Sequence, residues 1–377
     1  MFDDVYLAKI LQRTATEAKA AQATGAKVIG SYCAFTPKEL ISAAGAIPVS
    51  LCAGSQSSIP LAEQHLPRNL CALIKSSYGH GMGGTCPYFQ ETDLILADAT
   101  CDGKKKMYEL MRRIRPLHLL QLPQTADTDE SRDYWRGEIV KIKKVIEEFC
   151  DCEITDAAMR AQIRQYNKMR RTVTAIYSLN CGPVPLLFGH ELDIVTSTGG
   201  FECNLPARME EMEQVIELAR ERGNTAEYQA RVAGRPRILV TGCPTTNMKV
   251  VDLIENSGGI VVSLENCGGQ KTIGELVDED APPLEALADC YLRIACSCMS
   301  PNHRRLVLLK KLIKDYRIDG VIDMIWDGCH TYNVESFFVK EMVEGMEIPF
   351  LRLTTDYAEY DTGQLMTRIE GFLELMS

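Results

Sequence analysis

Residues 237–242, Arg-Ile-Leu-Val-Thr-Gly, run straight into Cys243, and residues 27–32, Lys-Val-Ile-Gly-Ser-Tyr, run into Cys33 in the same way. Both are short apolar stretches of the kind that forms a strand buried in a parallel sheet. Two further stretches in each half also lead to a cysteine; these are Cys52 and Cys101 in the first half, and Cys267 and Cys329 in the second. Ligands of open α/β sheets bind at the carboxyl ends of the strands. The pattern therefore predicts a large sulfur-ligated cofactor in a cleft between two lobes.

The rest of the chain repeats this alternation of short apolar runs and helical patterns. The predicted strands are 27–32, 47–52, 93–98 and 117–122, and then 237–242, 260–265, 318–325 and 348–353. Such alternation is the signature of parallel βαβ units. It predicts two similar doubly wound α/β domains, Rossmann-like or flavodoxin-like, with the cofactor between them. We place the N-terminal domain at 1–180, including long trailing helices at 131–150 and 155–180, and the C-terminal domain at 181–377.

Three local signals near the N-terminus are also specific. Residues 4–23 predict an amphipathic helix. Thr36-Pro-Lys-Glu39 predicts a helix start with a capping box, in which Thr36 and Glu39 bond each other's backbone N–H groups. The glycine-rich stretch 79–86, which ends at Cys86, predicts a loop.

Composition excludes several classes of partner. The chain has 377 residues, a net charge of −10 and 46% hydrophobic residues, which suits a globular protein of two domains. The acidic balance argues against nucleic acid and anionic membranes as partners. The basic runs 104–106 and 112–115 predict a solvent-exposed helix face. We find no signal peptide and no apolar run of about 18–20 residues, so the expected location is cytoplasmic, with no membrane contact.

The fifteen cysteines are an odd number, and we expect them to be reduced. Cys71, Cys101 and Cys329 stand at predicted helix starts, where free N–H groups lower a thiol's pKa and favour bound negative charge. An iron–sulfur cluster with thiolate ligands is anionic, so such positions suit it. From the residues alone we favour ligation by Cys71, Cys86, Cys101, Cys267, Cys298 and Cys329.

The remaining cysteines fall into two classes. The roles of four of them stay open, namely Cys33, Cys52, Cys243 and Cys296. The other five are expected to be buried apolar residues, namely Cys150, Cys152, Cys181, Cys203 and Cys290. Structural zinc usually needs compact Cys-x₂₋₄-Cys pairs, which this dispersed pattern lacks.

Two nucleotide-like motifs lack their structural context. Residues 79–84 satisfy G-x-G-x-x-G but follow a predicted helix instead of a strand. Residues 268–272 resemble the end of a P-loop, yet Gln270 replaces the glycine before Lys271. We therefore expect no nucleotide to bind to this chain itself.

Several longer motifs resemble the 2-hydroxyacyl-CoA dehydratase and benzoyl-CoA reductase superfamily. Three of these motifs are Cys33-Ala-Phe-Thr-Pro-Lys-Glu-Leu, Cys71-Ala-Leu-Ile-Lys-Ser-Ser-Tyr and Thr100-Cys-Asp-Gly-Lys-Lys-Lys. Three others resemble its single-chain branch, the double-cubane cluster proteins: Glu265-Asn-Cys-Gly-Gly, Cys296-Ser-Cys-Met-Ser-Pro-Asn and Cys329-His-Thr-Tyr-Asn-Val-Glu. The resemblance covers nearly the whole chain.

The resemblance implies a homodimer whose subunits each hold an [8Fe-9S] double-cubane cluster on six thiolates. It assigns Cys71, Cys101 and Cys329 to one cubane, and Cys86, Cys267 and Cys298 to the other. Cys296 is the alternative to Cys298, and Cys33 is the alternative to Cys86. A separate ATP-dependent iron–sulfur activator is the implied electron donor, and a small unsaturated molecule is the implied substrate. His80, His330 and Tyr332 lie beside presumed ligands and are candidates for proton supply.

Two other functions remain open at this point. The first is a 2-hydroxyacyl-CoA dehydratase subunit with one [4Fe-4S] cluster, which leaves Cys267 and Cys298 unexplained. The second is a carrier of metal or cluster without catalytic activity. Six candidate thiols from two lobes favour the double-cubane reductase over both.

Overall fold

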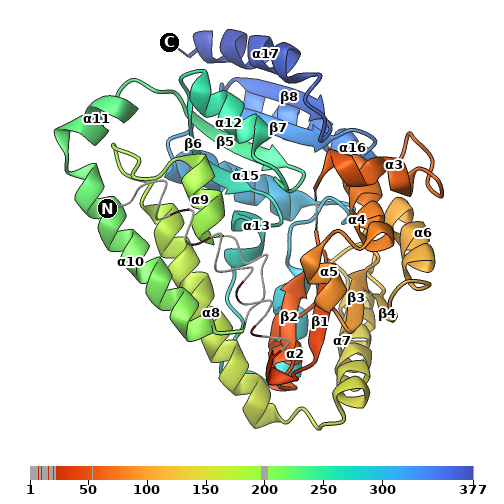
Figure 1. Cartoon of the computed structure of the whole chain (residues 1–377). Coiled ribbons are helices and arrows are strands. Elements are labelled where there is room, and N and C mark those ends of the chain that lie inside the picture. The colour runs from red at the N-terminus through yellow and green to blue at the C-terminus, as the bar shows by residue number, and fades with distance from the viewer. Residues whose placement is uncertain are drawn as a thin grey trace.

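Two parallel sheets of four strands each organise the chain (Figure 1). The computed structural model describes residues 23–52, 54–196 and 203–376, together with Leu7, Ile10, Thr16 and Ala20. The predicted helix at 4–23 lies mostly outside these residues. In the first sheet the strands are β1 Val28–Tyr32, β2 Ile47–Ser50, β3 Leu94–Asp98 and β4 Leu117–Leu120. In the second they are β5 Arg237–Gly242, β6 Ile260–Glu265, β7 Gly320–Trp326 and β8 Phe350–Thr355.

Both sheets have the same strand order. It is β2-β1-β3-β4 in the first and β6-β5-β7-β8 in the second, with every pairing parallel. Every residue of β1, β3, β5, β6 and β7 is buried, because helices cover both faces of each sheet. This confirms the prediction of two similar doubly wound α/β units, and the observed strand ends lie within two residues of the predicted ones.

Short helices surround the first sheet. They are α2 Lys38–Ala43, η1 Gln56–Ser58, α3 Ile59–Ala62, α4 Ala72–Gly83, α5 Pro87–Glu91 and α6 Asp102–Met111. Around the second sheet lie α12 Lys249–Asn256, α13 Gln270–Ile273, α15 His303–Asp315, α16 His330–Glu344 and α17 Thr362–Glu374, whereas α14 Pro283–Leu292 lies beside α7 and α8. In sequence, the helices between the two halves are α7 Asp129–Cys150, α8 Asp156–Ser178, α9 Gly189–Thr196, α10 Leu205–Gly223 and α11 Ala226–Val232.

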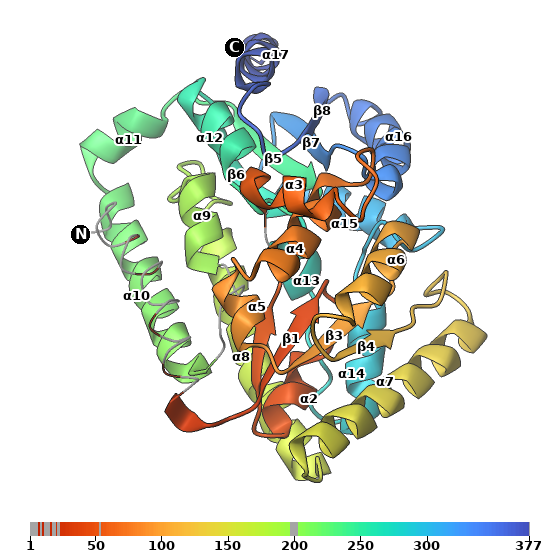
Figure 2. The ribbon, with the colours of Figure 1, turned by 45° about the vertical axis from the view of Figure 1, so that its right-hand side comes forward.

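The two halves of the chain share a core. Helix α14 from the second half packs against α7 and α8 from the first, and Figure 2 shows α7 and α14 side by side. Trp135 of α7 is fully buried there, and its indole N–H donates to the carbonyl of Ala288 at 2.9 Å. Phe35 meets Trp135 edge-on, so the end of β1 joins the same cluster. Because side chains from both halves pack together, the domain boundary near residue 180 stays a prediction.

Two local predictions are wrong. The capping box does not form, because Thr36 donates to Asp98 at 2.9 Å and Glu39 pairs with Arg170 at 2.7 Å; the residue before α2 is Pro37. The glycine-rich stretch is not a loop, because residues 79–83 are the last turns of α4. A side chain at Gly79 would collide with the carbonyl of Ser58, so glycine lets this helix approach that backbone closely.

The helices of the described part of the chain give no sign of a membrane anchor. Among those residues, no helix is both long enough and apolar enough to cross a bilayer.

Candidate metal centre

Four of the six predicted ligands are the residues that precede a helix. Cys71 precedes α4, Cys86 precedes α5, Cys101 precedes α6 and Cys329 precedes α16. At such positions the free N–H groups of the first turn face the sulfur, and the helix dipole favours the thiolate. Backbone N–H groups of the following helix lower the pKa of all four thiols, while a neighbouring thiol in Cys71 and burial in Cys86 and Cys101 raise it overall.

A first group of thiols joins the two lobes. The sulfur of Cys329 accepts hydrogen bonds from the thiols of Cys243 and Cys71, and these bonds lower its pKa. The bond to Cys329 raises the pKa of Cys71 in turn, and burial raises that of Cys243. The three thiols thus form one hydrogen-bonded group. Cys71 comes from the first half of the chain, whereas Cys243 and Cys329 come from the second.

A second group surrounds the Cys296-Ser-Cys298 turn. The thiol of Cys298 donates to Cys296 and lowers the pKa of Cys296 to about 6. Burial raises the pKa of Cys267 to about 11, and the neighbouring Cys296 and Cys52 add to this effect. The turn is held by Asn302, whose side-chain amide donates to the carbonyl of Cys296 at 3.0 Å. Here again a neighbouring thiol lowers the pKa of one member of the group.

Cys101 connects the two groups. Burial is the main cause that raises its pKa, and the charges of Cys329 and Cys296 act in the same direction. Cys329 belongs to the first group and Cys296 to the second, so Cys101 is an electrostatic neighbour of both.

Cys86 stands apart from the other five predicted ligands. Burial raises its pKa, while the backbone N–H groups of Phe89 and Tyr88 donate to its sulfur and oppose that shift. Tyr32 is its neighbour inside the first lobe. Among the described residues, no interaction joins Cys86 to the other five cysteines, so its role as a ligand stays a prediction.

Cys33 lies where β1 meets the second group. Its backbone has φ +71°, a left-handed conformation that costs energy for any residue except glycine. Its sulfur accepts a hydrogen bond from Lys104 Nζ at 2.5 Å and lies 3.5 Å from Thr100 Oγ1. Lys104 therefore departs from the predicted solvent-exposed face of its basic run, because its ammonium turns inward.

The five cysteines predicted to be buried do not all behave alike. Cys290 is buried, and Cys150, Cys152 and Cys181 are partly buried. Cys203 is exposed, so the prediction is wrong for this residue. It lies immediately before Asn204, the capping residue of α10, outside the packed part of that helix.

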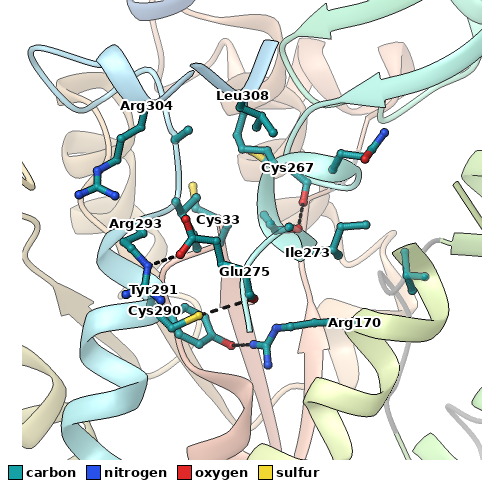
Figure 3. A pocket seen from close by; sticks show the side chains of 18 of the residues that line it. Cys33, Arg170, Cys267, Ile273, Glu275, Cys290, Tyr291, Arg293, Arg304 and Leu308 are labelled. Carbon is teal, nitrogen blue, oxygen red and sulfur yellow. Dashed lines mark hydrogen bonds and ion pairs between the residues drawn. The ribbon is translucent and has the colours of Figure 1, made fainter. Parts of the chain in front are cut away.

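A cavity of about 510 Å³ opens beside the second group of thiols. Figure 3 shows Cys33 and Cys267 at one side of it and the Arg170–Tyr291 pair at the other. The two oxygens of the buried Glu39 carboxylate accept from Arg170 and from the Tyr291 hydroxyl, both at 2.7 Å. This triad connects α2, α8 and α14, so its contacts join both halves of the chain.

Behind the cavity lies a buried network of charges. Lys271, which lines the cavity, donates to the hydroxyl of Tyr332 at 2.6 Å and lies 3.4 Å from Glu265 Oε1. Arg305 pairs with the other oxygen of Glu265 at 3.2 Å and also with Glu335. Lys271 thus has a carboxylate and a phenol as partners.

The three candidates for proton supply differ in position. Tyr332 is buried in this network, next to Cys267 and Cys296. His330 is exposed, and the His80 ring shares a hydrogen bond of 2.7 Å with Thr85. Of the three, Tyr332 is the one linked to the cavity, through Lys271.

All donors in these two groups are sulfur atoms, the donor type that holds iron–sulfur clusters. Within the ranges that the structure describes, no three His, Cys, Asp or Glu side chains converge on one ion position. The thiols form two groups linked by Cys101, and in each group neighbouring thiols lower the pKa of one member, Cys329 or Cys296. Sulfur ligands alone, spread around a larger volume, suit an iron–sulfur cluster.

Sequence reasoning left Cys243 open although it bonds to one predicted ligand, Cys329, and is an electrostatic neighbour of another, Cys71. The signal was its position after β5, equivalent to that of Cys33 after β1. The inward turn of Lys104 had no signal of its own, because Lys105 and Lys106 beside it are exposed.

Comparison with known proteins agrees with the motifs. The family model for the D-component of 2-hydroxyglutaryl-CoA dehydratase matches residues 33–376. A protein of Escherichia coli (strain K12) named putative dehydratase subunit YjiM is 44% identical over 355 residues, which cover 93% of this chain and 92% of that protein. The (R)-2-hydroxyglutaryl-CoA dehydratase subunit beta of Acidaminococcus fermentans is 23% identical, with 94% and 93% covered. A benzoyl-CoA reductase subunit of Thauera aromatica is 22% identical, with 90% and 87% covered.

These matches confirm the resemblance to this superfamily, and relatives named as dehydratase and reductase subunits indicate an enzyme. With nearly the whole chain matched, the protein belongs to the 2-hydroxyglutaryl-CoA dehydratase D-component family.

Proposed function

We propose that this protein holds an [8Fe-9S] double-cubane cluster and uses it to reduce a small unsaturated molecule. The electrons come from a separate ATP-dependent iron–sulfur protein, and the working unit is a homodimer. The observation that carries the proposal is the pair of thiol groups, one around Cys329 and one around Cys296, linked by Cys101. A single [4Fe-4S] cluster needs only one such group.

The first cubane would be held by Cys71, Cys101 and Cys329. Their contacts support this, since Cys71 donates to Cys329 and Cys101 is a neighbour of Cys329. Cys243 also donates to Cys329 and is a further thiol within reach of the same group.

The second cubane would be held by Cys267, Cys298 and a third thiolate. The motifs assign Cys86 to this third place, with Cys33 as the alternative. The contacts favour Cys33, because it lines the cavity together with Cys267 while Cys86 faces Tyr32 and its own helix. Cys296 stays the alternative to Cys298, since the two thiols share a hydrogen bond.

When bound, such a cluster supplies storage and transfer of single electrons at low potential. Reduction of a triple bond to a double bond consumes two electrons from the activator and two protons. The cavity holds the substrate beside Cys33 and Cys267. Lys271 and Tyr332 share a hydrogen bond at its wall, where they can hold a proton and orient a polar substrate atom.

A second function, a 2-hydroxyacyl-CoA dehydratase subunit with one [4Fe-4S] cluster, is favoured by the names of the relatives. Iron and acid-labile sulfide, measured per chain after anaerobic purification, separate the two. About eight irons support the double cubane and about four support the dehydratase subunit. Zinc without sulfide contradicts both. Acetylene reduction with the ATPase partner present then tests the reductase activity.

A further inference from the structure

We propose that Lys104 is a positioning residue of the metal centre, whose buried ammonium provides a fixed positive charge that makes the bound cluster easier to reduce. This inference rests on the proposed function, because it requires a redox cluster at the thiols described above. It adds a residue to the site that contributes charge instead of a ligand bond.

The position of Lys104 follows from the start of α6. Cys101 precedes this helix, and its carbonyl accepts from the N–H of Lys105, which makes the first turn. Lys104 lies in that turn, three residues after Cys101. From there its side chain reaches back across the end of β1, where Nζ donates to Cys33 Sγ at 2.5 Å.

The surroundings of this ammonium are thiols from both lobes. Lys104 is partly buried as a whole residue, but its ammonium lies in buried surroundings. The groups around it are Cys33, Tyr108, Cys52 and Cys101. The ammonium also acts on Cys267, which belongs to the second lobe.

The next two lysines of the run form ion pairs with carboxylates, and Lys104 does not among the described residues. Lys105 forms an ion pair with Asp102 at 3.5 Å, and Lys106 pairs with Glu109 at 2.6 Å. Within the described part of the chain, Lys104 forms no ion pair with a carboxylate; its hydrogen bond goes to Cys33. The nearby Asp98 carboxylate is occupied by the Phe35 N–H at 2.7 Å and by Thr36. The ammonium of Lys104 therefore has the sulfur of Cys33, and not a carboxylate, as its hydrogen-bond partner.

The strained backbone at Cys33 supports the same assignment. A left-handed non-glycine residue persists only where its surroundings hold it, and such residues concentrate at functional sites. Asp98 fixes the residues that follow Cys33 through its bonds to Phe35 and Thr36. The sulfur of Cys33 is thus held at the ammonium of Lys104.

The physical consequence concerns the reduction potential. A cation in buried surroundings is costly unless an anion faces it, and thiolates with an anionic cluster provide one. One electron from the activator adds one negative charge to the cluster, and a nearby ammonium stabilises that reduced state. Lys104 keeps its proton, and it forms and breaks no bond. Net charge and hydrogen bonds to sulfur are recognised determinants of such potentials.

The test is a redox titration of the anaerobically purified holoprotein, followed by electron paramagnetic resonance, with iron counted in each sample. In Lys104→Met the ratio of reduced to oxidised cluster at a fixed potential should fall at least about tenfold, which is a shift of about 59 mV for one electron. Lys104→Arg keeps the charge and should stay close to the wild type. Lys106→Met removes an exposed charge from the same helix and is the matched control.

Three results would overturn the inference. The first is a Lys104→Met variant with full iron content and a potential equal to that of Lys106→Met. The second is an equal shift in Lys104→Arg, which would make shape and not charge the cause. The third is a wild-type protein without iron and sulfide, a result that also removes the proposed function.

Loss of iron in the variants is informative as well. Should Lys104→Met lose its iron, Lys104→Gln, which can still donate to Cys33, takes its place in the titration. Loss of iron from both variants but not from Lys104→Arg shows that the positive charge is needed to hold the cluster, which supports the inference. Equal loss from Lys104→Arg contradicts it.

Discussion

The backbone N–H of Ala72 donates to the carbonyl of Asp327 at 3.0 Å. This bond joins the start of α4 in the first half of the chain to the loop after β7 in the second. Cys71 and Cys329 flank it on the two sides, and their sulfurs share a hydrogen bond. The first thiol group is therefore built across the lobes, by backbone and side chain together.

Gly328 makes this approach feasible. Its φ is +74°, and a Cβ at this position would lie 2.8 Å from the backbone nitrogen of Cys71. Gly328→Ala should therefore lower the free energy of unfolding by about 1–3 kcal/mol and reduce the iron content. Chemical denaturation and iron analysis measure the two effects. Gly363→Ala, in open space within α17, should leave both unchanged or slightly raise stability. Equal behaviour of the two variants would show that the lobes do not depend on this contact.

Lys271 tests the buried charge network. Both Lys271 and Glu265 have fully buried side chains, and Glu265 Oε1 has no hydrogen-bond partner among the described residues apart from this ion pair at 3.4 Å. Lys271→Met should cost about 3 kcal/mol of stability, the lower end of the usual range, because Arg305 still faces the other oxygen of Glu265. Lys311→Met breaks an exposed pair with Asp315 and should cost less than about 0.5 kcal/mol. Urea denaturation of both variants measures the difference, and similar losses would contradict a stabilising role for the buried pair.

Asp193 predicts a pH dependence of stability. Burial raises its pKa from the ordinary value of 3.8 to about 6. The folded chain therefore binds this proton more tightly than the unfolded chain does. The resulting stability is fully present below about pH 3.8 and is lost as the pH rises through about 6. Asp193→Asn stays neutral, so it should lose less stability than the wild type between about pH 4 and pH 7.

Denaturation midpoints of the holoprotein at several pH values check this. Asp133→Asn, which changes an exposed carboxylate on α7, should keep the slope of the wild type. A slope in Asp193→Asn that matches the wild type would show that another group causes the dependence.

The sequence predicts the fold well because its strands are short apolar runs with an unambiguous period. Strands β5 and β6 match their predicted bounds in full, and Cys243 and Cys267 follow closely after their ends. Parallel strand order then implies that Cys101, Cys267 and Cys329 emerge at the carboxyl edges of the sheets. The bounds of each strand, and the cysteine that follows it, can therefore be read from a single short segment of the sequence.

The parts that could not be predicted depend on how the two lobes meet. Cys243 becomes an electrostatic neighbour of Cys71 because α4 meets the loop at Asp327, which no sequence period reveals. Lys104 shares its basic run with two exposed neighbours, and only its bond to the distant Cys33 distinguishes it. The capping box failed for the same reason, since distant partners occupy Thr36 and Glu39.

The second cubane makes a prediction of its own. Cys267→Ser and Cys298→Ser should each lose about half or more of the iron, since one cubane of two depends on these thiols. The exposed Cys203 provides the control, and Cys203→Ser should keep the wild-type iron content. Full iron in either ligand variant would show that the second thiol group does not hold a cubane.

Cys33 and Cys86 compete for the last place in that group, and their surroundings predict different outcomes. Cys33 lines the cavity beside Cys267 and accepts from Lys104, whereas Cys86 accepts from the backbone N–H groups of its own helix. We therefore expect Cys33→Ser to lose iron and to change the electron paramagnetic resonance spectrum. Cys86→Ser should keep both, with a small loss of stability from the altered packing near Tyr32. The reverse pattern would return the assignment to Cys86, and it would mean that cluster binding draws the start of α5 toward the other thiols.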